Sequence, residues 1–160
     1  SDARFDAVRP ALARQCGDEA KHYRLIADRL RVLGVDAAKI DPLASGYSPM
    51  FVYLRSLETT VERLAAGQFT REALAQVRNR VFADFCEARG DVETAKLYRE
   101  VITPDEAHHH DVGRKLLPRF ITSDADGALA LRAAEQTLQL AEELQEIALM
   151  KLGVSSAPGC

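Results

Sequence analysis

The five-residue motif D-E-A-x-H occurs twice in the sequence, ending once at His22 and once at His109. Residues three apart in a helix lie on the same side, about one turn from each other. Glu19 with His22, and Glu106 with His109, can therefore each converge on one metal ion. Each stretch predicts half of a metal site.

Carboxylate and imidazole ligands together bind iron and manganese well, and they leave coordination positions open. Zinc accepts the same ligands. Glu19 lies in an apolar stripe, and burying a carboxylate without a counter-charge would cost several kcal/mol, roughly, so a cation or a proton must accompany it. The aspartates before the two glutamates, Asp18 and Asp105, are candidates for hydrogen bonds to the imidazole of the opposite motif. The favoured interpretation is a pair of iron ions.

Two other interpretations compete with this one. A single Glu-x-x-His is usually a solvated helix face, and only the second copy on a separate helix favours a metal site. Around Glu106, a threonine at position 103 and Pro104 also fit a capping box, in which the glutamate binds backbone donors at a helix start. His108 and His110 are expected to be exposed neighbours of a ligand.

The elements that carry these residues are expected to be helices. Strong helix formers abound, and no segment shows a sustained alternation of apolar and polar residues. The predicted helices cover residues 2–33, 51–67, 70–89, 92–118 and 124–152. Residues 35–49, with Pro42, Gly46 and Pro49, form a connection long enough to cross a bundle from end to end. The fold class is thus an all-α, antiparallel helix bundle with a long crossover connection.

Apolar spacing also predicts which face of each helix is buried. In the helix over residues 70–89, the inner stripe is expected to consist of Leu74, Val77, Val81, Phe85 and Ala88. In the helix over residues 92–118, Asp105 and His109 fall in the stripe with Tyr98, whereas Glu106 falls at its edge. Tyr98 is expected to pack in the core or to line the site.

Composition sets further limits. The 160 residues, 47% of them hydrophobic, suit one domain over residues 1–153, with residues 154–160 as a flexible tail. The net charge of −3 does not indicate a nucleic-acid-binding protein, which usually carries an excess of basic residues. No apolar run approaches the roughly 20 residues that are needed to cross a bilayer. The three widely spaced cysteines suggest neither a disulfide framework nor a thiolate zinc site. We expect a cytoplasmic protein without a membrane partner.

The two motifs, together with residues 85–90 and 93–98, resemble the ferritin-like di-iron carboxylate superfamily. In that superfamily two helices each supply a Glu and two others each supply a Glu-x-x-His. The resemblance covers about residues 2–117, and it is closest to a bacterial branch that includes tRNA hydroxylases acting on a modified adenosine. It implies a ferritin-like bundle in which Glu87 bridges the two ions. From its position alone, Glu87 lies off the apolar stripe, near a helix end.

The resemblance leaves the sixth ligand unassigned, because the expected extra glutamate ahead of Asp18 is missing. It could belong to a segment upstream of Ser1, or it could be Glu58. The last predicted helix offers Glu135 and Glu142 as a third alternative.

These observations predict a di-iron protein whose metal ligands are Glu19, His22, Glu87, Glu106 and His109. The expected activity is that of an oxygen-activating hydroxylase or oxidase. Its substrate would be a small molecule or a modified tRNA, of which the acidic balance disfavours the tRNA. Because no GxGxxG dinucleotide signature is present, electrons would come from an external donor. A homodimer is the assembly considered, and the alternatives are an iron-storage or sensing protein and a metal-free structural bundle.

Overall fold

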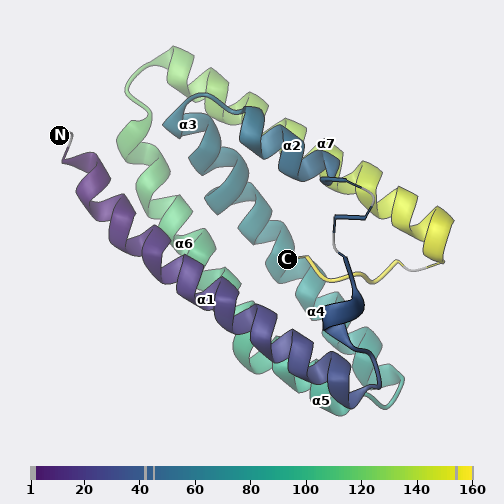
Figure 1. Ribbon diagram of the computed structural model, residues 1–160. Coiled ribbons are helices and arrows are strands. Elements are labelled where there is room, and N and C mark those ends of the chain that lie inside the picture. Colours follow the sequence, from purple (N-terminus) through teal and green to yellow (C-terminus); the bar gives the residue numbers. More distant parts are fainter. Residues whose placement is uncertain (1–2, 42, 45, 154, 160) are drawn as a thin grey trace. The chain divides into compact units, whose positions relative to one another are not determined.

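The computed structural model describes residues 3–41, 43–44, 46–153 and 155–159. These residues form helices and no strand, which confirms the all-α prediction (Figure 1). The chain divides into two compact units, Ser1–Ser48 and Pro49–Cys160, and each is described by itself. The expectation of one domain over residues 1–153 stays a prediction. Within the described part of the chain, no helix is both long and apolar enough to cross a bilayer.

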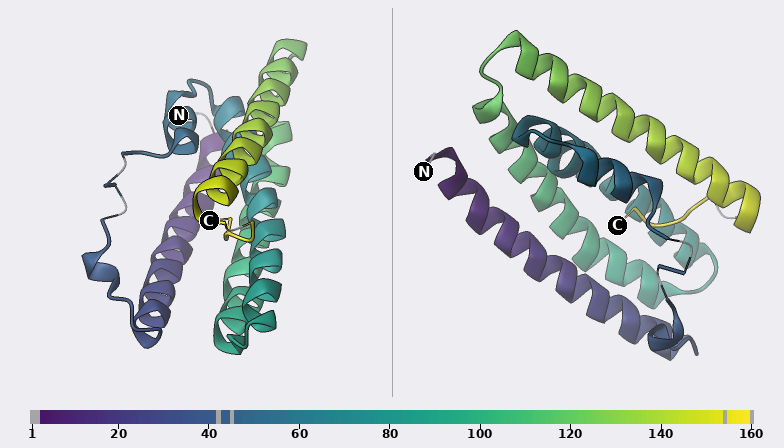
Figure 2. Two further views of the ribbon diagram at one scale, coloured as in Figure 1. Left: turned by 90° about the vertical axis from the view of Figure 1, so that its right-hand side faces the viewer. Right: turned by 45° about the horizontal axis from the view of Figure 1, so that its top comes forward.

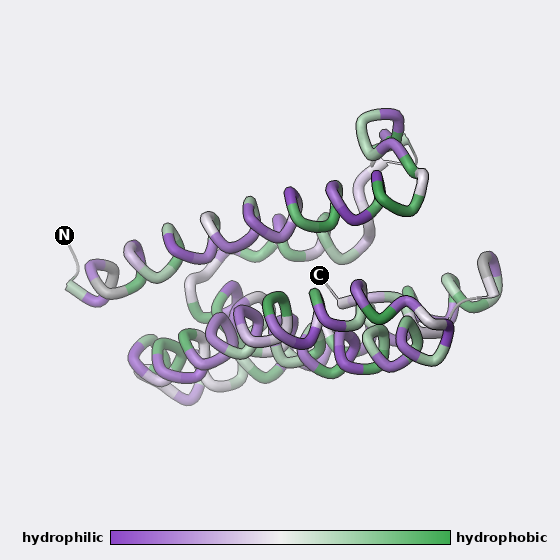
Figure 3. The backbone as a smooth tube through the Cα atoms, turned by 90° about the horizontal axis from the view of Figure 1, so that it is seen from below, coloured by the Kyte–Doolittle hydropathy of each residue, from purple (hydrophilic) through white to green (hydrophobic). Residues whose placement is uncertain are grey.

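The first unit contains one long helix, α1 (Arg4–Val32), and a short 3-10 helix, η1 (Ala37–Lys39). The helix α1 agrees with the predicted span, and Figure 3 shows hydrophilic residues on its successive turns. It ends in a Schellman-type turn, in which the N–H of Val35 donates to the carbonyl of Leu30 at 2.8 Å. Gly34 adopts the positive φ of 84° that this turn requires.

The second unit consists of two long helical runs and a final long helix (Figures 1 and 2). Its elements are α2 (Pro49–Ser56), α3 (Thr60–Arg63), η2 (Leu64–Arg71), α4 (Glu72–Ala88), α5 (Val92–Leu97), η3 (Tyr98–Ile102), α6 (Thr103–Phe120) and α7 (Asp124–Leu152). The segments η2 and η3 are π-helical. Helix α4 packs against α6, η2 packs against both α6 and α7, and α2 and α3 pack against α7.

The predicted helix end at Gly67 is wrong, because α3, η2 and α4 form one continuous run. A capping box starts this run, with the Thr59 side chain accepting the N–H of Glu62 at 3.2 Å. The π-helical segment then carries the chain through Gly67. A glycine inside a helix costs only about 1 kcal/mol, and the packing of η2 against α6 and α7 outweighs that cost.

The second run, α5, η3 and α6, passes through Pro104 without a break. In a regular α-helix the ring of Pro104 would meet the carbonyl of Glu100, and the wider π turn of η3 directly before it relieves that contact. The capping-box alternative at residue 103 is wrong for the same reason, since α6 continues from η3 and has no side-chain cap.

The predicted inner stripe of α4 is also wrong. Val77 and Val81, expected inside, are 60% and 48% exposed. The buried residues of α4 are Glu72, Ala75, Asn79, Ala83 and Cys86. Apart from Glu72 these side chains are small, so neighbouring backbones can approach α4 closely on this face.

Residues 155–159, which follow α7, lie against α4. The N–H of Gly159 donates to Oδ1 of the buried Asn79 at 2.9 Å. A Cβ atom on Gly159 would lie 2.6 Å from Cα of Ala75, so the two backbones are in close contact. Positions 154 and 160 of the predicted tail lie outside the described residues, and its flexibility stays a prediction.

Candidate metal centre

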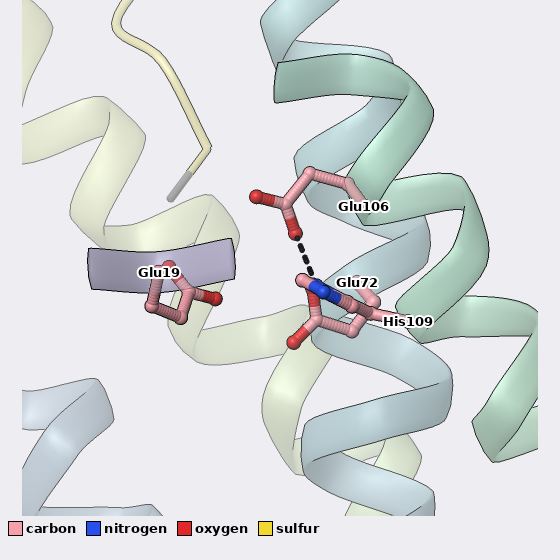
Figure 4. A group of neighbouring side chains, drawn as sticks. All are labelled: Glu19, Glu72, Glu106 and His109. Carbon is pink, nitrogen blue, oxygen red and sulfur yellow. Dashed lines mark ion pairs between the residues drawn. The ribbon is translucent and has the colours of Figure 1, made fainter. Parts of the chain in front are cut away.

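Three buried side chains of the second unit converge between α4 and α6. Glu72 comes from the first residue of α4, and Glu106 and His109 come from α6 (Figure 4). Nδ1 of His109 lies 3.4 Å from Oε2 of Glu106 and 3.7 Å from Oε2 of Glu72. Each residue is 1% exposed. Since each offers a ligand atom within 4.8 Å of the others, the three could hold a single ion.

The predicted pair on α6 is therefore brought together. Glu106 and His109 are one turn apart on the same face, as the Glu-x-x-His spacing predicts. Glu106 is not at the edge of the buried face, where the sequence placed it, but fully inside, whereas Asp105 is only half-buried. The π-helical segment η3 explains this difference, because it breaks the 3.6-residue period by which the stripe was extended from Tyr98.

The third member, Glu72, owes its orientation to η2. Its backbone N–H donates to the carbonyl of Gly67, five residues earlier, which is the π-helical pattern. One extra residue in a turn rotates everything that follows by about 100° relative to a regular α-helix. The π-helical segment thus sets which face Glu72 occupies.

A close backbone contact holds η2 against α6. A Cβ atom on Gly113 would lie 2.5 Å from the carbonyl carbon and oxygen of Gln68 and 2.7 Å from the nitrogen of Phe69. No real Cβ tolerates such distances, so only glycine fits at this point of α6. Gly113 lies one turn after His109, and the contact therefore fixes the spacing of the two helical runs beside the cluster.

The charges of the cluster are only partly balanced by its neighbours. Burial raises the pKa of Glu72, but hydrogen bonds with His109 and Glu106 and the positive charge of Arg71 outweigh burial and hold the pKa below its usual value. Nη1 of Arg71 lies 3.5 Å from Oε1 of Glu72. Glu72 is thus ready to act as an anionic ligand. A second carboxylate, that of Glu106, is buried beside that of Glu72. Two buried carboxylates in proximity favour a bound cation or a shared proton.

Glu87, the bridging ligand implied by the resemblance, is not part of this cluster. It lies fifteen residues after Glu72 on α4, which corresponds to roughly 22 Å along the helix axis. Its side chain is 53% exposed and accepts a hydrogen bond from Nη2 of Arg99 at 2.6 Å. The hydrogen bond and the charge of Arg99 lower the pKa of Glu87.

The first D-E-A-x-H motif lies on α1, in the other unit. Oε2 of Glu19 is 3.8 Å from Nδ1 of His22, so this pair also shares one face of its helix. Asp18 forms ion pairs on the same helix, at 3.7 Å with Arg14 and at 3.4 Å with Lys21. The meeting of the two motifs at one site stays a prediction.

The three glutamates considered for the sixth ligand, Glu58, Glu135 and Glu142, are exposed. Sequence reasoning missed Glu72, which lies near the start of the helix predicted over residues 70–89. The signal that could have revealed it is the spacing of the small residues, since Glu72, Ala75 and Asn79 follow one another at steps of three and four. The larger valines of α4 concealed that pattern.

Two further residues near the cluster differ in their roles. Tyr98 is 4% exposed and packs edge to face against Phe82, with ring centroids 4.8 Å apart, as expected of a core tyrosine. His110 is half-buried, and its Nδ1 lies 2.7 Å from the carbonyl oxygen of Phe69 in η2. It is therefore more than the exposed neighbour that the sequence predicted.

No family model, no curated protein and no solved structure matches this chain. A functional assignment must therefore rest on the motifs of the sequence and on the cluster formed by Glu72, Glu106 and His109.

Proposed function

We propose that this chain is a metal-binding helical protein of the ferritin-like type, with Glu72, Glu106 and His109 as the ligands of one ion. The observation that carries the proposal is the convergence of two carboxylates and one imidazole, each 1% exposed, with ligand atoms within 4.8 Å. Two carboxylates in so dry a place require positive charge, and a divalent cation supplies it most directly. The motif of Glu19 and His22 is proposed, from the sequence, to serve a second ion.

The donor set fits iron. Carboxylate oxygens and imidazole nitrogen suit ferrous iron, with manganese and zinc as chemical competitors. Three protein ligands leave positions open for further ligands, as catalytic metal sites require and closed structural sites do not. When bound, a pair of ferrous ions supplies the electrons that reduce dioxygen. We therefore infer an oxygen-activating hydroxylase or oxidase that draws its electrons from an external donor.

In this proposal the chain binds the metal ion, orients its ligands and excludes water from the site. Glu106 and His109 form a rigid pair because they share one turn of α6. Glu72 approaches from the opposite run, and Arg71 keeps it ionised at one oxygen while the other oxygen faces His109. Burial of all three side chains excludes water, which strengthens every electrostatic interaction in the site.

Metal content tests this proposal. Protein purified without chelator and reconstituted with ferrous iron under nitrogen should hold at least about one ion per chain, as measured by mass spectrometry of the eluted metal. Exposure to air should then give the near-ultraviolet absorption of a ferric pair if the second motif takes part. Less than about 0.2 equivalents of any transition metal per chain would refute metal binding and favour a structural bundle.

A matched set of variants identifies the ligands. Glu72→Gln and His109→Ala should each lose the bound iron while the far-ultraviolet circular dichroism stays helical. Glu100→Gln, a change of the same chemistry at an exposed glutamate of η3, should retain it. Equal iron contents in the native protein and in all three variants would exclude the proposed ligands.

A further inference from the structure

A single backbone carbonyl connects the two helical runs beside the cluster. The oxygen of Phe69, in η2, lies 2.7 Å from Nδ1 of His110 on α6. The same oxygen accepts the backbone N–H of Ala73, the residue directly after Glu72 in α4. Because a carbonyl can only accept, Nδ1 of His110 must carry the hydrogen. The chain of contacts thus runs from His110 through Phe69 to the backbone of Ala73, next to Glu72.

The ring of His110 is held in place from two sides. It packs on the ring of Phe69, with centroids 5.0 Å apart and planes tilted by 36°. One turn further along α6, Gly113 lets the backbone of η2 come within contact distance. The imidazole is therefore anchored to η2 and cannot swing away without giving up both the hydrogen bond and the ring contact.

We propose that His110 is a positioning residue for the metal centre. Acting through Phe69, it fixes the position of Glu72 relative to His109, the residue directly before His110 in the sequence. This inference rests on the proposed metal-binding function. The Phe69 carbonyl already accepts one backbone N–H, and a second donor from outside the π-helical segment restricts its orientation further. His110 supplies that donor from the helix that carries the other two ligands. It touches no metal and acts through Phe69.

Three replacements of His110 separate positioning from mere packing. Asparagine places an amide N–H close to the position of Nδ1, glutamine places it close to that of Nε2, and leucine removes the donor while keeping bulk. With Co²⁺ as the probe, His110→Leu and His110→Gln should bind about tenfold more weakly than the native protein, with an altered visible spectrum. His110→Asn should stay within about threefold. His108→Leu is the control on the same helix and should bind as the native protein does.

A second measurement does not depend on metal. In metal-free protein, His110→Leu should speed hydrogen exchange at the Ala73 amide, which donates to the Phe69 carbonyl, at least about fivefold, and His110→Asn should restore the slow rate. Native protein that holds no cobalt would refute the proposed function, and the exchange rates would still decide the role of His110. Native-like exchange at the Ala73 amide in His110→Leu, or equal cobalt affinity in the leucine and asparagine variants, would overturn the positioning role.

Discussion

The two ends of α4 carry glutamates of opposite character. At its first residue, Glu72 is 1% exposed and faces His109 across the gap to α6. Fifteen residues later, Glu87 is 53% exposed and pairs with Arg99 at the surface. The pKa of each carboxyl is lowered, for different reasons. At Glu72 burial raises the pKa, and the imidazole of His109, the carboxyl of Glu106 and the guanidinium of Arg71 together lower it by more. At Glu87 the exposed Arg99 alone lowers the pKa.

The family resemblance and the geometry thus select different glutamates of one helix as the metal ligand. The resemblance to ferritin-like proteins selects Glu87, because the residues around it match a motif. The structure selects Glu72, because η2 turns it toward Glu106 and His109.

The largest effect is expected from removing the partners of Glu72 on α6. Replacing both Glu106 and His109 by alanine should weaken ferrous iron binding by at least about 100-fold, because Glu72 alone cannot hold the ion. Isothermal titration under nitrogen measures this. Alanine at both His108 and Glu100 serves as the control, and a comparable loss in that protein would indicate a general fault in folding.

The next effect concerns the spacing of the two runs. Gly113→Ala should destabilise the protein by about 2 kcal/mol, because the added Cβ would overlap the backbone of Gln68. Gly127→Ala, at a helical glycine with open space around it, should instead stabilise it by about 0.5 kcal/mol. Urea unfolding followed by circular dichroism compares the two. Stabilisation by both changes would show that α6 does not touch η2.

The third effect concerns the electrostatics of the two glutamates in metal-free protein. Since both pKa values lie below the usual one, each carboxylate stabilises the fold above its unfolded pKa, and this contribution is lost as the pH falls through the folded pKa. Salt at about 1 M shortens the Debye length to about 3 Å. The pKa of Glu87 should then return toward its usual value, and that of Glu72 should stay lowered. Carbon-13 titration of the side-chain carboxyls measures both, and an equal salt response would contradict their different burial.

The smallest effect is expected from breaking the exposed ion pair between Glu87 and Arg99. Arg99→Leu should raise the pKa of Glu87 to its ordinary value and leave the unfolding midpoint and the iron content almost unchanged, because exposed ion pairs contribute little. Thermal unfolding and metal analysis provide the readouts. A marked loss of iron in this variant would connect the surface pair to the metal centre.

Much of the fold follows from local signals in the sequence. The spans of α1 and α7 agree with apolar periodicity, and Gly34, directly after the predicted helix over residues 2–33, adopts a positive φ. The errors lie at the two π-helical segments. A period of 3.6 residues cannot be carried across a π-helical segment, whose hydrogen bonds span five residues, so the break at Gly67 and the inner face of α4 were predicted wrongly.

The candidate site was predictable in part for the same reason. Glu106 and His109 are one turn apart, and a local motif suffices to pair them. Glu72 lies 34 residues before Glu106, and its approach depends on the π turn of η2 and on the glycine contact at Gly113. Neither is a short-range property of the sequence around Glu72.

The most direct test of the central claim is the affinity for ferrous iron of two variants of α4, Glu72→Gln and Glu87→Gln. Both remove one negative charge from the same helix and keep the size of the side chain. We predict that Glu72→Gln weakens binding at least about 30-fold, and that Glu87→Gln stays within about twofold of the native protein. Weakened binding in Glu87→Gln together with native binding in Glu72→Gln would contradict the account.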